Sequence, residues 1–132
     1  MASRTPAFPK SYANRPLRKA LETFAALPNR TTLDALLAAL RTGGIVVDIS
    51  GTTEAADPQV RTLLSTSGEL VLPLFTSIAE LRLAVPEEAR ATAQAMILPA
   101  AEALALVHTA DFVAVQFDPG SLAQVIKRDF VS

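Results

Sequence analysis

The chain has 132 residues, of which 50% are hydrophobic and 19% are charged, against about 25% charged residues in an ordinary globular domain. This length and composition predict one domain that buries a hydrophobic core without the help of a metal ion or a disulfide. The absence of cysteine excludes thiol nucleophiles and cysteine-built zinc sites, and the single histidine excludes a multi-histidine metal site within one chain.

Charge is distributed unevenly along the chain, although the formal net charge is only −1. Residues 1–41 carry seven cations and two anions, whereas residues 42–126 carry three cations and ten anions. A basic N-terminal region beside an acidic body favours pairing between the two, within one chain or between two chains. The acidic body would repel phosphate groups, so we expect no nucleic acid partner.

The first residues of the chain indicate a polar arm. Residues 1–13 contain two prolines and no periodic apolar face, so we expect a flexible basic arm followed by a single domain at residues 14–132. The arm lacks the continuous apolar core of a signal peptide, and no apolar run approaches the ~20 residues of a membrane helix. We therefore expect a cytoplasmic protein with no membrane partner.

Two amphipathic helices are predicted at the start of the domain. Asn14 is a suitable cap for the first helix, and the apolar residues within 17–24 follow the i, i+3, i+4, i+7 spacing of a buried stripe. The second helix repeats this spacing, with Thr31 or Thr32 as its cap and the glycine pair at 43–44 as its end. These glycines precede a strand, whereas a phosphate-binding loop follows one.

The pattern then changes to strands. The β-branched run at residues 45–49 predicts a strand, and residues 50–68 are polar and loop-like, with one or two helical turns allowed at 57–64. A second strand is predicted at residues 70–75, where Pro73 indicates an edge position or an irregular strand. Together these segments predict alternating helices and strands.

The second half of the domain begins with the capping-box spacing of Ser77 and Glu80, which predicts a short helix to about residue 83. A strand at 93–98, a helix opened by Pro99 and a nearly all-apolar strand at 112–117 then predict a right-handed βαβ unit. In this unit the last strand is central and covered by helices on both faces.

The chain closes with a predicted type II turn at residues 118–121, with proline and glycine at its central positions, and a short strand within 122–126. In sum, the sequence predicts an α/β fold with a mixed sheet of about five strands, two N-terminal helices and one βαβ unit.

Two sets of residues are candidates for binding. Ligands favour the carboxyl ends of parallel strands, and the strand ends here carry five polar or turn-forming residues. These candidate ligand-binding residues are Thr76, Ser77, Asp118, Gly120 and Ser121. Each of them also has a local role as a cap or turn former, which leaves a purely structural alternative open. The candidate partner-binding residues are Arg15, Arg18 and Lys19, which lie off the apolar stripe of the first helix.

No catalytic residue, metal site or cofactor is predicted. His108 lies at the predicted C-terminus of a helix, near Asp111, where a surface imidazole that complements the helix dipole is expected. No Gly-x-Ser-x-Gly motif accompanies it, and no aspartate-rich loop has the spacing of a calcium site.

The segment LVLPLFTSIAEL at residues 70–81 resembles the "LPLFTS...L" signature of the SseB protein N-terminal domain family. The helix that begins near Asn14, the helix and strand within 33–49, and the turn at 118–121 resemble the family's other elements in order and spacing. The resemblance implies an α/β domain with a mixed sheet, in a family named for enhanced serine sensitivity and associated in annotation with type III secretion. Asp48 departs from the family's apolar, proline-bearing strand end.

Two functions remain open at this point. The first is a non-enzymatic protein-interaction module, with a protein partner or with self-association as a homodimer. The alternative is a small-molecule-binding regulatory domain that uses the polar groups at the strand ends. A broad exposed apolar patch would favour the first function, and a cleft with converging polar side chains would favour the second.

Overall fold

The computed structural model describes residues 12–54 and 58–131. Residues 1–11 of the predicted arm lie outside this range, whereas Tyr12 and Ala13 contact the folded domain. Ala13 forms a β-bridge with Ser77, and the Tyr12 hydroxyl accepts a hydrogen bond from the Gly44 amide at 2.7 Å. Two residues that the sequence assigns to the arm, Tyr12 and Ala13, thus contact the domain.

The two predicted N-terminal helices are α1 (Arg15–Ala26) and α2 (Arg30–Ala39). Asn14 caps α1 as predicted, because its side chain accepts a hydrogen bond from the Leu17 amide. The cap of α2 is Asn29 rather than Thr31 or Thr32. Asn29 and Thr32 form a reciprocal capping box, so the threonine that was expected as the cap serves as its partner one turn later.

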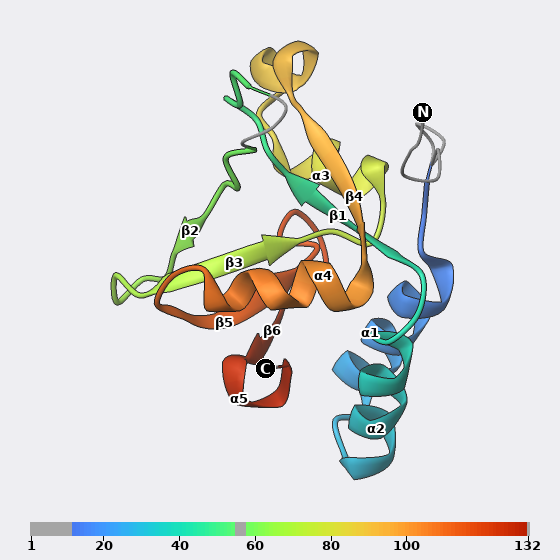
Figure 1. Cartoon of the computed structure of the whole chain (residues 1–132). Coiled ribbons are helices and arrows are strands. Elements are labelled where there is room, and N and C mark those ends of the chain that lie inside the picture. The colour runs from blue at the N-terminus through green and yellow to red at the C-terminus, as the bar shows by residue number, and fades with distance from the viewer. Residues whose placement is uncertain (1–11, 55–57, 132) are drawn as a thin grey trace.

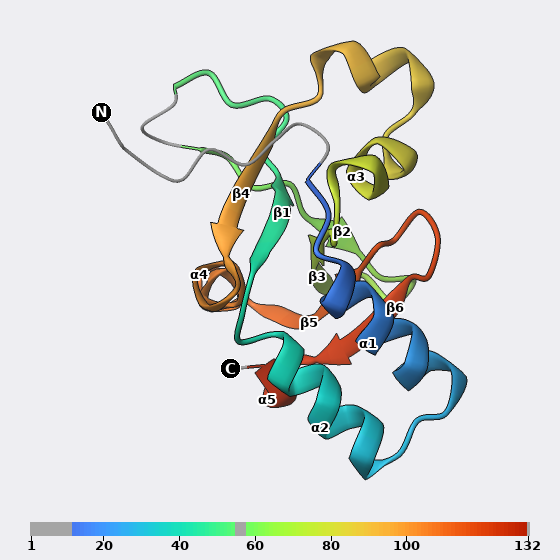
Figure 2. The same ribbon diagram turned by 90° about the vertical axis from the view of Figure 1, so that its right-hand side faces the viewer.

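The apolar stripes of both helices are buried in the core. Leu17 and Leu21 of α1 and Leu36 of α2 have no exposed surface, and they pack with residues of the strands in one cluster. Figures 1 and 2 show α1 and α2 side by side below the sheets. The helical spacing in the sequence thus identified the buried faces correctly.

The described residues form six strands in two sheets. Their bounds are β1 (Gly44–Asp48), β2 (Leu63–Leu64), β3 (Leu70–Leu74), β4 (Ala95–Pro99), β5 (Phe112–Phe117) and β6 (Gln124–Lys127). The larger sheet has the order β2-β3-β5-β6, in which β3 and β5 are parallel and the other pairs are antiparallel. The smaller sheet pairs β1 with β4, and a bridge between Val46 and Phe75 joins β1 to the chain just after β3 (Figure 1).

The fold is the mixed α/β arrangement that the sequence predicts, but the strands of the βαβ unit pair differently. Helix α4 (Ala100–Ala105) runs between β4 and β5 as expected, yet these two strands lie in different sheets. The parallel neighbour of β5 is β3, and α3 (Ile78–Ala84), the 3-10 helix η1 (Glu87–Thr92), β4 and α4 separate them in sequence.

The strand β5 is central, as predicted, because β3 and β6 flank it. Val115 and Phe117 on β5 have no exposed surface, whereas Val113 is 40% exposed. The expectation of burial on both faces is therefore wrong for this end of the strand. A register shift beside Leu70 and Val71 of β3 accompanies this exposure.

Two further segments lie next to the edge strands β2 and β6 of the larger sheet. Residues 58–62 form no helix and lead directly to β2, so the described part of the loop lacks the helical turns allowed by its sequence. The short helix α5 (Arg128–Val131) follows β6, and the Arg128 guanidinium donates a hydrogen bond to the Phe112 carbonyl.

Within the described residues, no helix has the length and apolarity needed to cross a membrane.

Candidate functional site

Asp118, directly after β5, is the centre of a polar cluster at the strand ends. Its side chain has no exposed surface, and Oδ1 accepts a hydrogen bond from the Thr76 amide at 2.8 Å. Its Oδ2 accepts two more, from the Thr76 hydroxyl at 2.8 Å and from Nη1 of Arg18 at 2.7 Å. Both carboxylate oxygens are thus used within the protein, and they tie the end of β5 to the end of β3 and to α1.

Arg18 connects this cluster to two further acidic residues. Its Nε donates to Glu22 at 2.8 Å, and its Nη1 lies 3.1 Å from Glu80 Oε2 and 3.1 Å from Ser121 Oγ. The hydrogen bond to Glu22 raises the pKa of Arg18, partial burial opposes this, and Asp118 and Glu80 raise it further. Arg18 of the predicted partner-binding set therefore meets Asp118 and Ser121 of the predicted ligand-binding set in one ionic cluster.

Glu80 shows why the predicted capping box is only half formed. Ser77 caps α3, since its Oγ accepts a hydrogen bond from the Glu80 amide at 3.0 Å. The Glu80 carboxylate does not return to the cap, because it pairs with Arg18 and accepts a 2.6 Å hydrogen bond from Ser121. A long-range ion pair has replaced the local contact.

Gly120 lies where two backbone segments approach each other closely. The turn at 118–121 is closed by a hydrogen bond from the Ser121 amide to the Asp118 carbonyl, but it is not the predicted type II turn. Asp118 has the positive φ of 50°, whereas Gly120 does not adopt a positive φ. A Cβ atom on Gly120 would lie 3.0 Å from the Ala84 amide nitrogen. This position therefore favours glycine, because the turn packs closely against α3.

Arg15 and Lys19 differ from Arg18 although all three were predicted as one partner-binding set. Both side chains are exposed, and they line a shallow depression of about 450 Å³ that Arg18, Ser77 and Glu80 also line. Neither forms an ion pair with another described residue. Their role in partner binding stays a prediction, whereas Arg18 has a structural role.

This difference predicts separate effects on stability. Arg18→Ala is expected to lower the free energy of unfolding by about 2 kcal/mol, because it leaves the buried Asp118 without its cation. Arg15→Ala and Lys19→Ala, as controls on the same helix, are expected to change it by less than about 0.5 kcal/mol. Urea denaturation of the three variants measures these values. Equal effects would contradict the assignment of Arg18 to the fold.

His108, the single histidine, lies at the end of the 3-10 helix η2 (Leu106–His108), close to the predicted position. Its Nδ1 lies 3.1 Å from Nη2 of Arg128 and accepts the hydrogen bond, since a guanidinium only donates. The exposed ring therefore lies at the end of the helix and contacts the guanidinium of Arg128 in α5. Among the described residues, no group of three or more His, Asp and Glu side chains could hold a metal ion.

A second site, which sequence reasoning missed, is a cleft beside β3. The strands β1 and β2 pair along the same edge of β3, β1 through Phe75 and β2 through Val71. Pro73 lies between these two pairings. The edge of β3 therefore has a gap at Pro73, where no described strand pairs with this edge. Because proline has no N–H, every backbone donor at this point of the edge is accounted for. The same proline is the signal in the sequence that could have located the gap.

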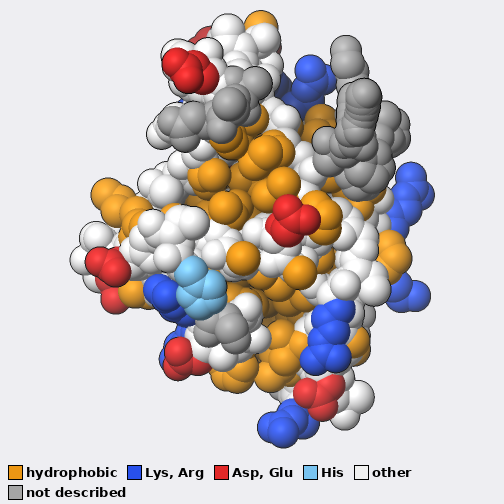
Figure 3. Space-filling model, viewed as in Figure 1, with side chains coloured by type: hydrophobic (Ala, Val, Ile, Leu, Met, Phe, Trp, Pro, Cys, Tyr) orange, Lys and Arg blue, Asp and Glu red, His pale blue; other side chains and the backbone are white. Residues whose placement is uncertain are grey.

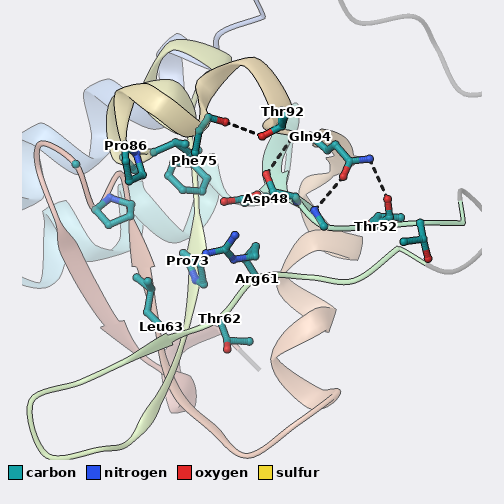
Figure 4. A pocket seen from close by; sticks show the side chains of 18 residues that line it. Asp48, Thr52, Arg61, Thr62, Leu63, Pro73, Phe75, Pro86, Thr92 and Gln94 are labelled. Atoms are coloured by element: carbon teal, nitrogen blue, oxygen red, sulfur yellow. Dashed lines mark hydrogen bonds between the residues drawn. The ribbon is translucent and has the colours of Figure 1, made fainter.

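The cleft has a volume of about 660 Å³ and is lined by both apolar and polar residues. Pro73, Phe75, Leu63, Val85, Pro86 and Pro119 provide its main apolar surface. Among its polar residues, the Asp48 carboxylate accepts a hydrogen bond from the Ser50 amide, and the Gln94 side chain forms hydrogen bonds with the backbone of the 51–52 loop. Figure 4 shows Arg61 and Asp48 facing the same hollow as Phe75 and Pro73. Of the predicted ligand-binding residues, Gly120 alone lines this cleft.

Comparison with known proteins identifies a family. The model of the SseB protein N-terminal domain matches residues 17–132, which is nearly the whole chain and includes both sites. No curated protein and no solved structure matches the chain. The motif at residues 70–81, which carried the resemblance, forms β3, the cap of α3 and its first turn. The chain belongs to the SseB protein N-terminal domain family.

Proposed function

We propose that this chain is a non-enzymatic protein-interaction module of its family, and that the cleft beside β3 receives a segment of the partner protein. The observation that supports this proposal most is the composition of the cleft, in which prolines, Phe75 and Leu63 lie together with several polar residues. Protein interfaces likewise combine apolar surface that excludes water with polar groups that form hydrogen bonds.

The volume of the cleft agrees with this proposal. About 660 Å³ holds several side chains of an inserted segment, and the exposed guanidinium of Arg61 is available to an acidic group of the partner. Leu63 is 37% exposed on β2, so it offers apolar surface to a partner at little cost to the fold.

The alternative, a small polar ligand bound at the strand ends, has less support. Thr76, Asp118 and Ser121 do lie together, but their hydrogen-bonding groups are paired with one another, with Arg18 and with Glu80. A ligand at this position would have to displace hydrogen bonds that hold α1 and α3 to the sheet. The cluster is therefore better suited to a structural role.

Two neighbouring leucines of β2 provide a matched test of the proposed site. Leu63 lines the cleft, whereas Leu64 is 70% exposed and does not. Proteins captured from the native host's lysate are compared for the wild-type chain and the variants Leu63→Asp and Leu64→Asp by quantitative mass spectrometry. We expect Leu63→Asp to reduce capture of the partner by about tenfold or more, equivalent to about 1.4 kcal/mol, and Leu64→Asp to leave it unchanged.

A captured protein whose recovery is equal for both variants would contradict the proposed site. A small molecule that co-purifies with the wild-type chain and is lost from Asp118→Ala, with no protein partner affected by Leu63→Asp, would instead support the alternative. Thermal melting of each variant verifies that the fold is retained before capture.

A further inference from the structure

Within residues 12–54 and 58–131, the strand β4 has no neighbouring strand on its outer edge. It pairs with β1 in the register Val46 to Ile97 and Val47 to Met96. The amide of Ile49 donates to the Gln94 carbonyl and the amide of Ala100 donates to the Gly43 carbonyl, so residues 94 and 100 face β1. Because hydrogen-bonded and non-hydrogen-bonded pairs alternate along an antiparallel ladder, Met96 and Leu98 also face β1.

It follows that the N–H and C=O groups of Ala95 and Ile97 point away from β1. No described residue forms a backbone hydrogen bond with them. Figure 2 shows β1 on one side of β4 and no other labelled strand on the opposite side. The edge thus presents four backbone groups, two donors and two acceptors, that another strand can bind.

The features that protect an edge strand are placed on other strands. On the larger sheet, β2 has only two residues, and β6 carries the exposed charge of Lys127. The sequence of β4, AMILP, contains no charged residue, and its proline lies at its last position. Figure 3 shows hydrophobic side chains gathered over β4 and the start of α4. Of these three strands, β4 is the longest, and its only protective residue is the proline at its end.

We propose that β4 pairs antiparallel with β4 of a second copy of this chain, with the two-fold axis at Met96. In this register Ala95 faces Ile97 of the second copy and Ile97 faces its Ala95. The two pairs exchange four hydrogen bonds and use all four open backbone groups of each copy. A register centred on Ile97 would instead place the Ala95 carbonyl opposite Pro99, which has no N–H to donate.

The second copy is favoured as the occupant because β4 is complementary to itself. In an isologous interface the same patch lies on both copies, so the patch must be complementary to itself. The N–H and C=O groups of Ala95 and Ile97, placed symmetrically about Met96, meet this requirement. The absence of charge within β4 means that two copies bring no like charges to the axis. The apolar side chains around the strand add surface for burial at the same contact.

The absence of cysteine from the chain permits a direct test of the register. Opposite residues of a non-hydrogen-bonded antiparallel pair have Cα atoms about 4.5 Å apart, within the range of a disulfide. We expect Met96→Cys to form a covalent dimer under mild oxidation at a yield several times that of Ala79→Cys. The control residue Ala79 is exposed on α3, away from the proposed axis.

Sedimentation velocity on the whole chain provides an independent measurement. Ala95→Lys places a charge at the exposed edge, and we expect it to weaken self-association by about tenfold or more while the melting temperature stays unchanged. Ala79→Lys is the matched control and is expected to associate like the wild type. Equal oxidation of the two cysteine variants, or a dimer that Ala95→Lys leaves intact, would overturn the proposal.

Discussion

Asp118→Ala is expected to lower the free energy of unfolding by about 3 kcal/mol or more. The carboxylate is fully buried and accepts three hydrogen bonds, two from Thr76 and one from Arg18. Its removal leaves the Thr76 amide buried without an acceptor and takes away the shortest of the contacts by which the Arg18 guanidinium holds α1 to the strand ends. Urea denaturation monitored by circular dichroism measures the loss.

Ser121→Ala is the matched control for this prediction. Ser121 belongs to the same turn and the same cluster, but its side chain is exposed and its bonds to Glu80 and Arg18 are open to solvent. We expect this variant to lose less than about 1 kcal/mol. A loss for Asp118→Ala as small as that for Ser121→Ala would show that the cluster does not fasten α1 to the sheet.

The same cluster shows which parts of the site the sequence predicts. Local roles can be predicted from the sequence. Ser77 caps α3 by accepting a hydrogen bond from the amide three residues later, and Asn14 caps α1 in the same way. The contact between Arg18 and Asp118 spans 100 positions and depends on where α1 packs against the sheet. A single sequence contains no signal for that packing, so Arg18 was predicted in a different site from Asp118 and Ser121, with which it forms one cluster.

The pairing of the strands is equally difficult to predict from a single sequence. The existence of β1, β3 and β5 follows from short apolar runs, and the residues of β5 match the predicted range. Which strands become neighbours depends on non-local contacts, and here β4 pairs with β1 while β3 lies beside β5. The cleft arises from this pairing, because β1 and β2 share one edge of β3 on either side of Pro73. Pro73 was correctly taken as a sign of irregularity, but the hollow beside it required the pairing to be known.

Val115→Asp is expected to lower the free energy of unfolding by about 4 kcal/mol or more, which is a large part of the stability of a domain of this size. Val115 has no exposed surface and lies at the centre of β5, opposite Leu72 of β3 and Ile126 of β6. A carboxylate at this position would be buried among apolar side chains with no cation to pair with. Chemical denaturation, or loss of soluble protein on expression, would report the effect.

Val113→Asp on the same strand separates burial from β propensity. Val113 is 40% exposed, so its carboxylate would reach solvent while the change of residue type is identical. We expect this variant to remain folded and to lose about 1 kcal/mol, mainly from the lower strand preference of aspartate. A Val115→Asp chain that unfolds as cooperatively and at the same urea concentration as Val113→Asp would place β5 outside the core and contradict the central position assigned to it.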